Sequence, residues 1–312
     1  MALWEGLQQA VLAPEGVGVD SLTSIEGWLM PASDSYRRAA SLLWVGGPVQ
    51  QAILSGLTAS LGGLGEGNVR AAATALTQAL RSQDPRVPAC KAAIVSRLVQ
   101  MLEDSQPATN AAAAMTVTSS SNNKSKKSEL GRLGIPTLRT MDRLLQEGLL
   151  QDLSPAEWIG SWAGMVRRIL RGCQQPAALQ AGASVYAQLS LLPALPLPQR
   201  QSLLASTTML TGHGYPSVRR AAGEAIYLAL LALGPEQLEI SEDDFDLLLT
   251  LSMTTPWDSD NKAAALEARE QLLQVAKLPR PVMVKTGKAK ADSENKLADH
   301  GNYGDLVREA GY

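Results

Sequence analysis

The stretch that decides the fold covers residues 215–233 and reads Tyr-Pro-Ser-Val-Arg-Arg-Ala-Ala-Gly-Glu-Ala-Ile-Tyr-Leu-Ala-Leu-Leu-Ala-Leu. Its apolar residues recur at the three- and four-residue spacing that places them on one face of an α-helix. They are Val218, Ala221, Ala222, Ala225, Ile226, Ala229, Leu230 and Leu233. Pro216 suits a first helical turn, and Gly234-Pro235 is a typical helix end. Because this face is rich in alanine, we expect a neighbouring helix to pack closely against it.

The same template occurs upstream, where Val69-Arg70 opens a segment with apolar residues at Ala72, Ala73, Leu76 and Leu80. A Val-Arg start followed by alanine and leucine at helical spacing is typical of the second helix of a HEAT repeat. Such repeats are paired helices of about 40–47 residues that become stable by stacking. The sequence therefore predicts an all-α, HEAT/armadillo-like solenoid of antiparallel helix pairs. The alternative is a pair of ordinary amphipathic helices in a globular helical domain.

The composition of the 312 residues agrees with a helical protein inside the cell. A single phenylalanine leaves few aromatic residues for strands. A formal net charge of −2 gives no general attraction to nucleic acid or to an anionic membrane. The two cysteines suggest no disulfide framework, and the first residues lack a secretory signal. The charge-free stretch between Arg171 and Arg200 is interrupted by glutamines and prolines, so we expect a buried helix there and no membrane insertion.

Further helices are predicted along the chain from periodicity and end signals. One should be capped by Asp34 or Ser35, and the next should bury Val49, Ala52, Ile53, Gly56, Leu57 and Leu61. The others are expected at 87–102, 135–145, 155–170, 177–192, 198–210, 241–252 and 261–276, with a short amphipathic helix around Leu3 and Leu7.

Composition shifts suggest four parts. Residues 1–103 are predicted to be helical repeats whose first helices lack a packing neighbour, and 131–284 to be further repeats. Residues 104–130, rich in Ser, Asn and Lys, are predicted to be a disordered insertion, and 285–312 a disordered tail. The lysines of the insertion could bind an acidic surface, although a solvated linker accounts for them more simply.

Several stretches together resemble the carboxy-terminal region of the tubulin-folding cofactor D family. They follow one another in the same order and approximate spacing over about residues 35–284. They are Ile-Leu-Ser-Gly-Leu-Thr-Ala-Ser-Leu-Gly-Gly-Leu-Gly-Glu at 53–66, Val69-Arg70, Pro-Thr-Leu-Arg-Thr-Met-Asp at 136–142, Tyr-Pro-Ser-Val-Arg-Arg at 215–220, Ile226-Tyr227, Trp257-Asp258 and Leu-Pro-Arg-Pro at 278–281. The chain resembles only the last part of these longer proteins, so we expect a truncated gene model, a fragment or a free-standing derivative.

The resemblance implies a HEAT-repeat chaperone that binds β-tubulin and assembles and dismantles the α/β-tubulin heterodimer. It further implies work with other tubulin cofactors and an Arf-like small GTPase, a contribution to GTP hydrolysis by tubulin, and a cytoplasmic place with possible association with microtubules. No nucleic-acid partner, cofactor or metal is expected.

Five residues are candidates for contact with a partner: Arg70, Arg219, Arg220, Trp257 and Asp258. The arginines could meet an acidic protein surface, and the resemblance implies that tubulin offers one. In the alternative interpretation, each arginine starts its helix and pairs with a carboxylate of an adjacent repeat. Trp257-Asp258 could likewise only anchor the turn before the last helix.

The sequence offers little for catalysis. His213 lies in a Gly-His-Gly turn, His300 lies in the predicted tail, and neither has a Cys or carboxylate at metal-ligand spacing. Cys90 and Cys173 fit small core residues. Asp243, Asp244 and Asp246 fit the first turn of a helix better than a cation site. We therefore expect a protein-binding scaffold and no catalytic residue. The alternatives are a HEAT scaffold with a different client and, from another class, a helical hydrolase that uses His213 or Cys173.

Overall fold

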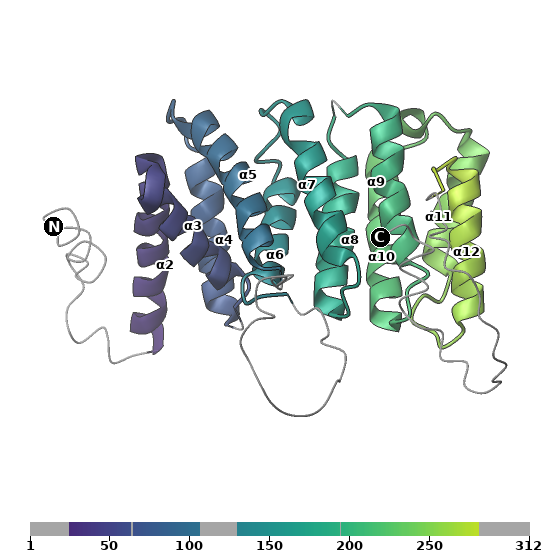
Figure 1. Cartoon of the computed structure of the whole chain (residues 1–312), viewed down its shortest axis with the longest axis horizontal. Coiled ribbons are helices and arrows are strands. Elements are labelled where there is room, and N and C mark those ends of the chain that lie inside the picture. The colour runs from purple at the N-terminus through teal and green to yellow at the C-terminus, as the bar shows by residue number, and fades with distance from the viewer. Residues whose placement is uncertain (1–24, 64, 107–129, 194, 281–312) are drawn as a thin grey trace, which may run out of the picture. The chain divides into compact units, whose positions relative to one another are not determined.

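The computed structural model describes residues 25–63, 65–106, 130–193 and 195–280. Within these residues every regular element is a helix (Figure 1). The described residues form two compact units, the first from residues 25–105 with 131–158, and the second from residues 159–280. Each unit consists of stacked helix pairs, so the predicted all-α, solenoid-type fold is confirmed.

The first unit contains the helices α2 (Ile25–Ser41), η2 (Leu42–Val45), α3 (Gly47–Leu61), α4 (Glu66–Leu80), α5 (Val87–Asp104) and α6 (Gly134–Gln146). Helix α4 packs against α2 and α3, while α6 packs against α3 and α5. Thus α6, which follows the predicted insertion, completes the unit that precedes it. The boundary between the units lies inside α7 (Pro155–Leu170), between Trp158 and Ile159.

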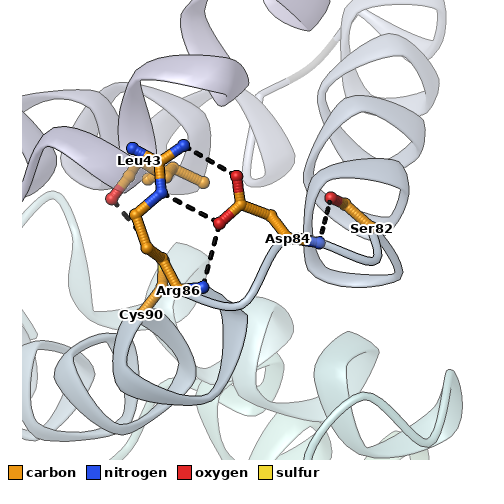
Figure 2. A network of polar contacts seen from close by, with 5 residues as sticks. All are labelled: Leu43, Ser82, Asp84, Arg86 and Cys90. Atoms are coloured by element: carbon orange, nitrogen blue, oxygen red, sulfur yellow. Dashed lines mark hydrogen bonds and ion pairs between the residues drawn. The ribbon is translucent and has the colours of Figure 1, made fainter.

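A polar turn fixes the path from α4 to α5 (Figure 2). The Arg86 side chain donates from Nε and Nη2 to the two carboxylate oxygens of Asp84, at 2.9 and 2.7 Å, and its backbone N–H donates to the same carboxylate. Ser82 Oγ accepts from the Asp84 backbone N–H. These bonds to Arg86 lower the pKa of Asp84 to about 2. One turn into α5, the buried Cys90 thiol donates to the Leu43 carbonyl of η2.

The second unit continues with α8 (Pro176–Ser190), α9 (Leu197–Leu210), α10 (Pro216–Leu233), η4 (Glu236–Leu238), α11 (Glu242–Thr254) and α12 (Lys262–Val275). Helix α10 packs against α8, α9 and α11, and α12 packs against α9 and α11. The predicted inner face of α10 is buried at Val218, Ala222, Ile226, Ala229, Leu230 and Leu233. Gly234 ends the helix with a φ of 72°, which suits glycine.

Most predicted helices agree with the structure, but two details are wrong. No helix starts at Asp34 or Ser35, because α2 runs through both residues, and Asp34 instead accepts from Arg37 of the same helix. The face of α3 is also shifted, since Ala52 and Gly56 are exposed while Leu54 and Thr58 are buried.

The charge-free stretch after Arg171 is confirmed as packed helix, with much of α8 buried. None of the helices in the described residues is long and apolar enough to cross a membrane. The tail at 285–312, the amphipathic segment around Leu3, and the insertion, apart from residues 104–106 and 130, lie outside the described residues.

Candidate partner-binding surface

Arg70 lies on the outer side of α4, where its side chain is 77% exposed. Its guanidinium donates to Glu66 Oε1 at 2.7 Å, one turn earlier on the same helix, and the Glu66 side chain is 85% exposed. An exposed pair of this kind contributes at most about 1 kcal/mol to stability, and salt screens it. Arg70 is therefore available to a partner at little cost to the fold.

Arg70 borders a groove between α4 and α6, here called the α4–α6 groove, with a volume of about 550 Å³. The residues that line it are Leu61, Gly63, Glu66, Val69, Arg70, Ala73, Thr74, Arg139 and Arg143. Arg139 and Arg143 stand one turn apart on α6 and are both exposed. Among the described residues, the Arg139 side chain has no ion pair or hydrogen bond, so the groove carries an uncompensated positive charge.

Glu147 joins the far ends of α4 and α6. It follows the last residue of α6 and accepts from Arg143 at 2.7 Å through Oε1. Its Oε2 accepts from Arg81, the residue after α4, at 2.8 Å. Arg81 and Arg143 thus share one carboxylate, which fixes the helix ends. The two guanidinium groups and the single carboxylate together carry a net positive charge.

Gly62 and Pro136 meet where α3 ends beside the start of α6. A Cβ atom on Gly62 would lie 2.9 Å from Pro136 Cα and closer still to its ring, which is too short for a carbon contact. Only glycine therefore permits this approach. Gly62 and Pro136 belong to two of the sequence stretches singled out above, and their contact positions Arg139 beside α4.

Arg219, unlike the exposed Arg70, is buried, and only 2% of its surface is exposed. Its guanidinium donates from Nε to the Trp257 carbonyl at 2.9 Å, and from Nη1 to the carbonyls of His213 and Gly214 at 2.9 and 3.2 Å. Nη2 donates to the Ser259 carbonyl. Burial lowers the pKa of the guanidinium, opposed by the charges of Asp260 and Asp258. Arg219 ties the start of α10 to the turn before α12.

Trp257 occupies the same corner, 5% exposed, and donates from Nε1 to the Ser252 carbonyl of α11 at 2.9 Å. Its indole lies over Gly223 of α10 so closely that a Cβ there would come within 2.9 Å of Cε2. The anchoring role considered for Trp257 therefore matches its environment. Asp258, its neighbour, is exposed.

His213 lies in this corner as well and is 5% exposed. Its Nδ1 accepts from the Tyr215 backbone N–H at 3.0 Å, a bond that needs the neutral ring. Burial, with the nearby positive charges of Arg219 and Lys262, lowers the pKa of His213 to about 4. The ring is neutral near pH 7 and holds the loop that precedes α10.

The candidate residues are thus divided between two places. Arg70 lies in the first unit, and the other four gather around the start of α10 in the second. Arg220 is exposed and donates to Glu224 of its own helix at 2.9 Å. The alternative interpretation expected each arginine to pair with a carboxylate of an adjacent repeat, and among the described residues none of the three does so. Arg139 and Arg143 were missed, although their four-residue spacing on the polar side of an amphipathic helix was a usable signal.

The groups considered for chemistry lie apart from one another. Cys90 and Cys173 are buried, and burial raises the pKa of both thiols, which disfavours the reactive thiolate. Ser241 Oγ accepts from the Asp244 backbone N–H, so the acidic residues there belong to a capped first turn. Within the part of the chain that the structure describes, no three His, Cys, Asp or Glu side chains form a metal-binding group.

In a comparison with protein families, residues 17–178 match the tubulin folding cofactor D C-terminal family. This range holds α2 to α7, the α4–α6 groove and the contact of Gly62 with Pro136. The stretches at 215–220, 257–258 and 278–281 lie beyond it. Neither the curated proteins nor the solved structures contain a match. Since the matched residues make up just over half of the chain, the protein belongs to the tubulin folding cofactor D C-terminal family.

Proposed function

We propose that this chain is a protein-binding scaffold that acts in tubulin folding, binding β-tubulin and the α/β-tubulin heterodimer. The observation that carries the proposal is the family match over residues 17–178, which includes the exposed arginines of the first unit. Stacked helix pairs offer broad surfaces that suit a folded protein client. Of the candidate residues, the exposed Arg70 fits a contact with an acidic client best.

A binding role also agrees with the environments of His213 and the two cysteines, the residues considered for catalysis. His213 is committed to a hydrogen bond inside a buried corner, and the two cysteines are buried thiols with raised pKa values. We therefore propose that the chain has no active site of its own. Any contribution to GTP hydrolysis would come from its effect on bound tubulin, and we assign no residue to that step.

The wider partners follow from the same proposal. Other tubulin cofactors and an Arf-like small GTPase are proposed as co-workers, and the cytoplasm, with a pool on microtubules, as the location. These proposals rest on family membership, since no described surface is specific for any of these proteins.

The test is retention of purified tubulin by the immobilised full chain, with circular dichroism on the same sample. We expect a helical protein that retains tubulin and loses it as salt rises, because exposed charge pairs are screened. A folded chain that ignores tubulin but captures a different client would support the alternative of a general HEAT scaffold and contradict the tubulin role.

A further inference from the structure

Two grooves flank α4 and share its exposed residues Arg70 and Thr74. One is the α4–α6 groove. The other, the α2–α4 groove, has a volume of about 330 Å³ and is lined by Ser33, Asp34, Arg37, Gly67, Arg70, Ala71, Thr74, Ala75 and Gln78. Arg70 and Thr74 stand one turn apart and form the ridge between the two hollows. A single bound segment could therefore contact both grooves across one helix.

The charge that lines these grooves is mainly positive. Four arginines face two carboxylates, and each carboxylate already pairs within its own helix, Asp34 with Arg37 and Glu66 with Arg70. Arg139 has no such pair among the described residues. The chain as a whole has a formal net charge of −2, so the positive charge around the two grooves is opposite in sign to the net charge of the chain.

The base of the α4–α6 groove is apolar. Leu61 and Ala73 are buried and Val69 is half-buried. An apolar base bordered by arginines fits a polypeptide, which offers side-chain carbon as well as carboxylates. It fits a nucleic-acid backbone less well, since the groove carries no aromatic side chain for stacking and has Glu66 at its edge.

We propose that the α4–α6 groove binds a short acidic peptide segment, with carboxylates on Arg139 and Arg70. Arginine suits this role because its planar guanidinium can donate two parallel hydrogen bonds to one carboxylate. Arg139 is the first contact, because it gives up no existing partner. Arg70 exchanges its exposed bond to Glu66 for one to the ligand. The proposal rests on the proposed function, since it names the kind of segment that the scaffold takes.

The test measures binding of a fluorescein-labelled, glutamate-rich peptide to the full chain by fluorescence anisotropy. The Arg70→Gln/Arg139→Gln double variant should bind about tenfold more weakly, since two charge-assisted bonds are lost. Arg171→Gln, which removes an exposed arginine of the second unit, should leave the affinity unchanged. Thermal unfolding of each variant should match the parent, because Arg70 and Arg139 are exposed. Arg139→Gln alone is the second variant, should the double variant unfold early.

Equal affinity of the parent and the double variant would overturn the proposal, as would an equal loss in Arg171→Gln. Tighter binding of a single-stranded oligonucleotide, or of a phosphoserine peptide of equal charge, would overturn the assignment to a carboxylate peptide. Tubulin retention separates the two proposals. Groove-dependent peptide binding without tubulin retention supports the peptide site and contradicts the tubulin role. Tubulin retention without peptide binding overturns the peptide site alone.

Discussion

Helices α4 and α10 both carry a Val-Arg pair near their start, followed by alanines, yet their arginines have opposite roles. Arg70 in α4 has a side chain that is 77% exposed and pairs with Glu66 of its own helix. Arg219 in α10 is 2% exposed and donates to four backbone carbonyls. The local pattern produces a helix in both cases. What decides the role of the arginine is the chain that packs beside it.

The difference traces to the turn between α11 and α12. In the second unit, Trp257 and Ser259 bring their carbonyls over the start of α10, and a buried guanidinium is the group that can satisfy several carbonyls at once. In the first unit, the corresponding side of α4 faces the α4–α6 groove. Arg70 is therefore a surface charge, whereas Arg219 is part of the core.

The largest effect on stability is expected when Arg219 is replaced by leucine, with the same change at Arg70 as the comparison. Arg219→Leu should lower the free energy of unfolding by about 3 kcal/mol or more, because it leaves buried carbonyls without donors. Arg70→Leu should change it by less than about 1 kcal/mol. Urea unfolding followed by circular dichroism measures both. Similar losses in the two variants would contradict the division between core and surface.

The next effect concerns the glycines at the two close helix contacts. Gly62→Ala and Gly223→Ala should each lower the free energy of unfolding by about 1–3 kcal/mol, since the added methyl would clash with Pro136 or Trp257. Gly56→Ala is the matched control within α3. Its position has nothing within 4 Å of an added Cβ, so alanine should stabilise the protein by about 0.5–1 kcal/mol. Equal effects at all three glycines would argue against both close contacts.

The corner at α10 should also make stability depend on pH. The pKa of His213 is lowered from 6.5 to about 4, so its contribution is complete above pH 6.5 and is lost as the pH falls toward 4. The loss should be roughly 3 kcal/mol, at about 1.4 kcal/mol for each pKa unit. His213→Asn, which keeps an acceptor for the Tyr215 N–H, should flatten the profile in this range. An unchanged slope in that variant would show that another group titrates.

The smallest effect belongs to the first unit, at the exposed turn of Asp84. Its pKa is lowered from 3.8 to about 2, so the contact with Arg86 stabilises the fold above about pH 4 and is lost as the pH falls through 2. A carboxyl NMR titration should show this low value. Titration near 3.8 would mean that the pair with Arg86 does not form in solution.

Local signals predicted the helices well because the helix ends are local. Pro216 and Gly234 bound α10 through their own backbone preferences, and the structure places the ends there. The predicted helix start at Asp34 or Ser35 was wrong because a capping residue is only a preference, and α2 continues through Asp34. The predicted buried face of α3 was wrong because nearly all residues of this helix are apolar or small. Its contacts with α4, α5 and α6 therefore determine which side is buried.

The sequence predicts the candidate site less well than it predicts the helices. Arg70 and Arg219 look alike locally, and two of the four carbonyls that accept from Arg219 belong to residues about 40 positions later. Arg139 could have been suspected from its place on the polar side of α6, but its closeness to Arg70 depends on the Gly62–Pro136 contact. That contact joins stretches more than 70 residues apart.

The measurement that tests the account most directly is tubulin retention by three full-length proteins of matched thermal stability: the parent, Arg70→Gln/Arg139→Gln, and Arg220→Gln. We expect the parent to retain tubulin, the double variant in the first unit to lose most of it, and Arg220→Gln to retain it. Full retention by the double variant, or loss with Arg220→Gln instead, would contradict the placement of the contact at the α4–α6 groove.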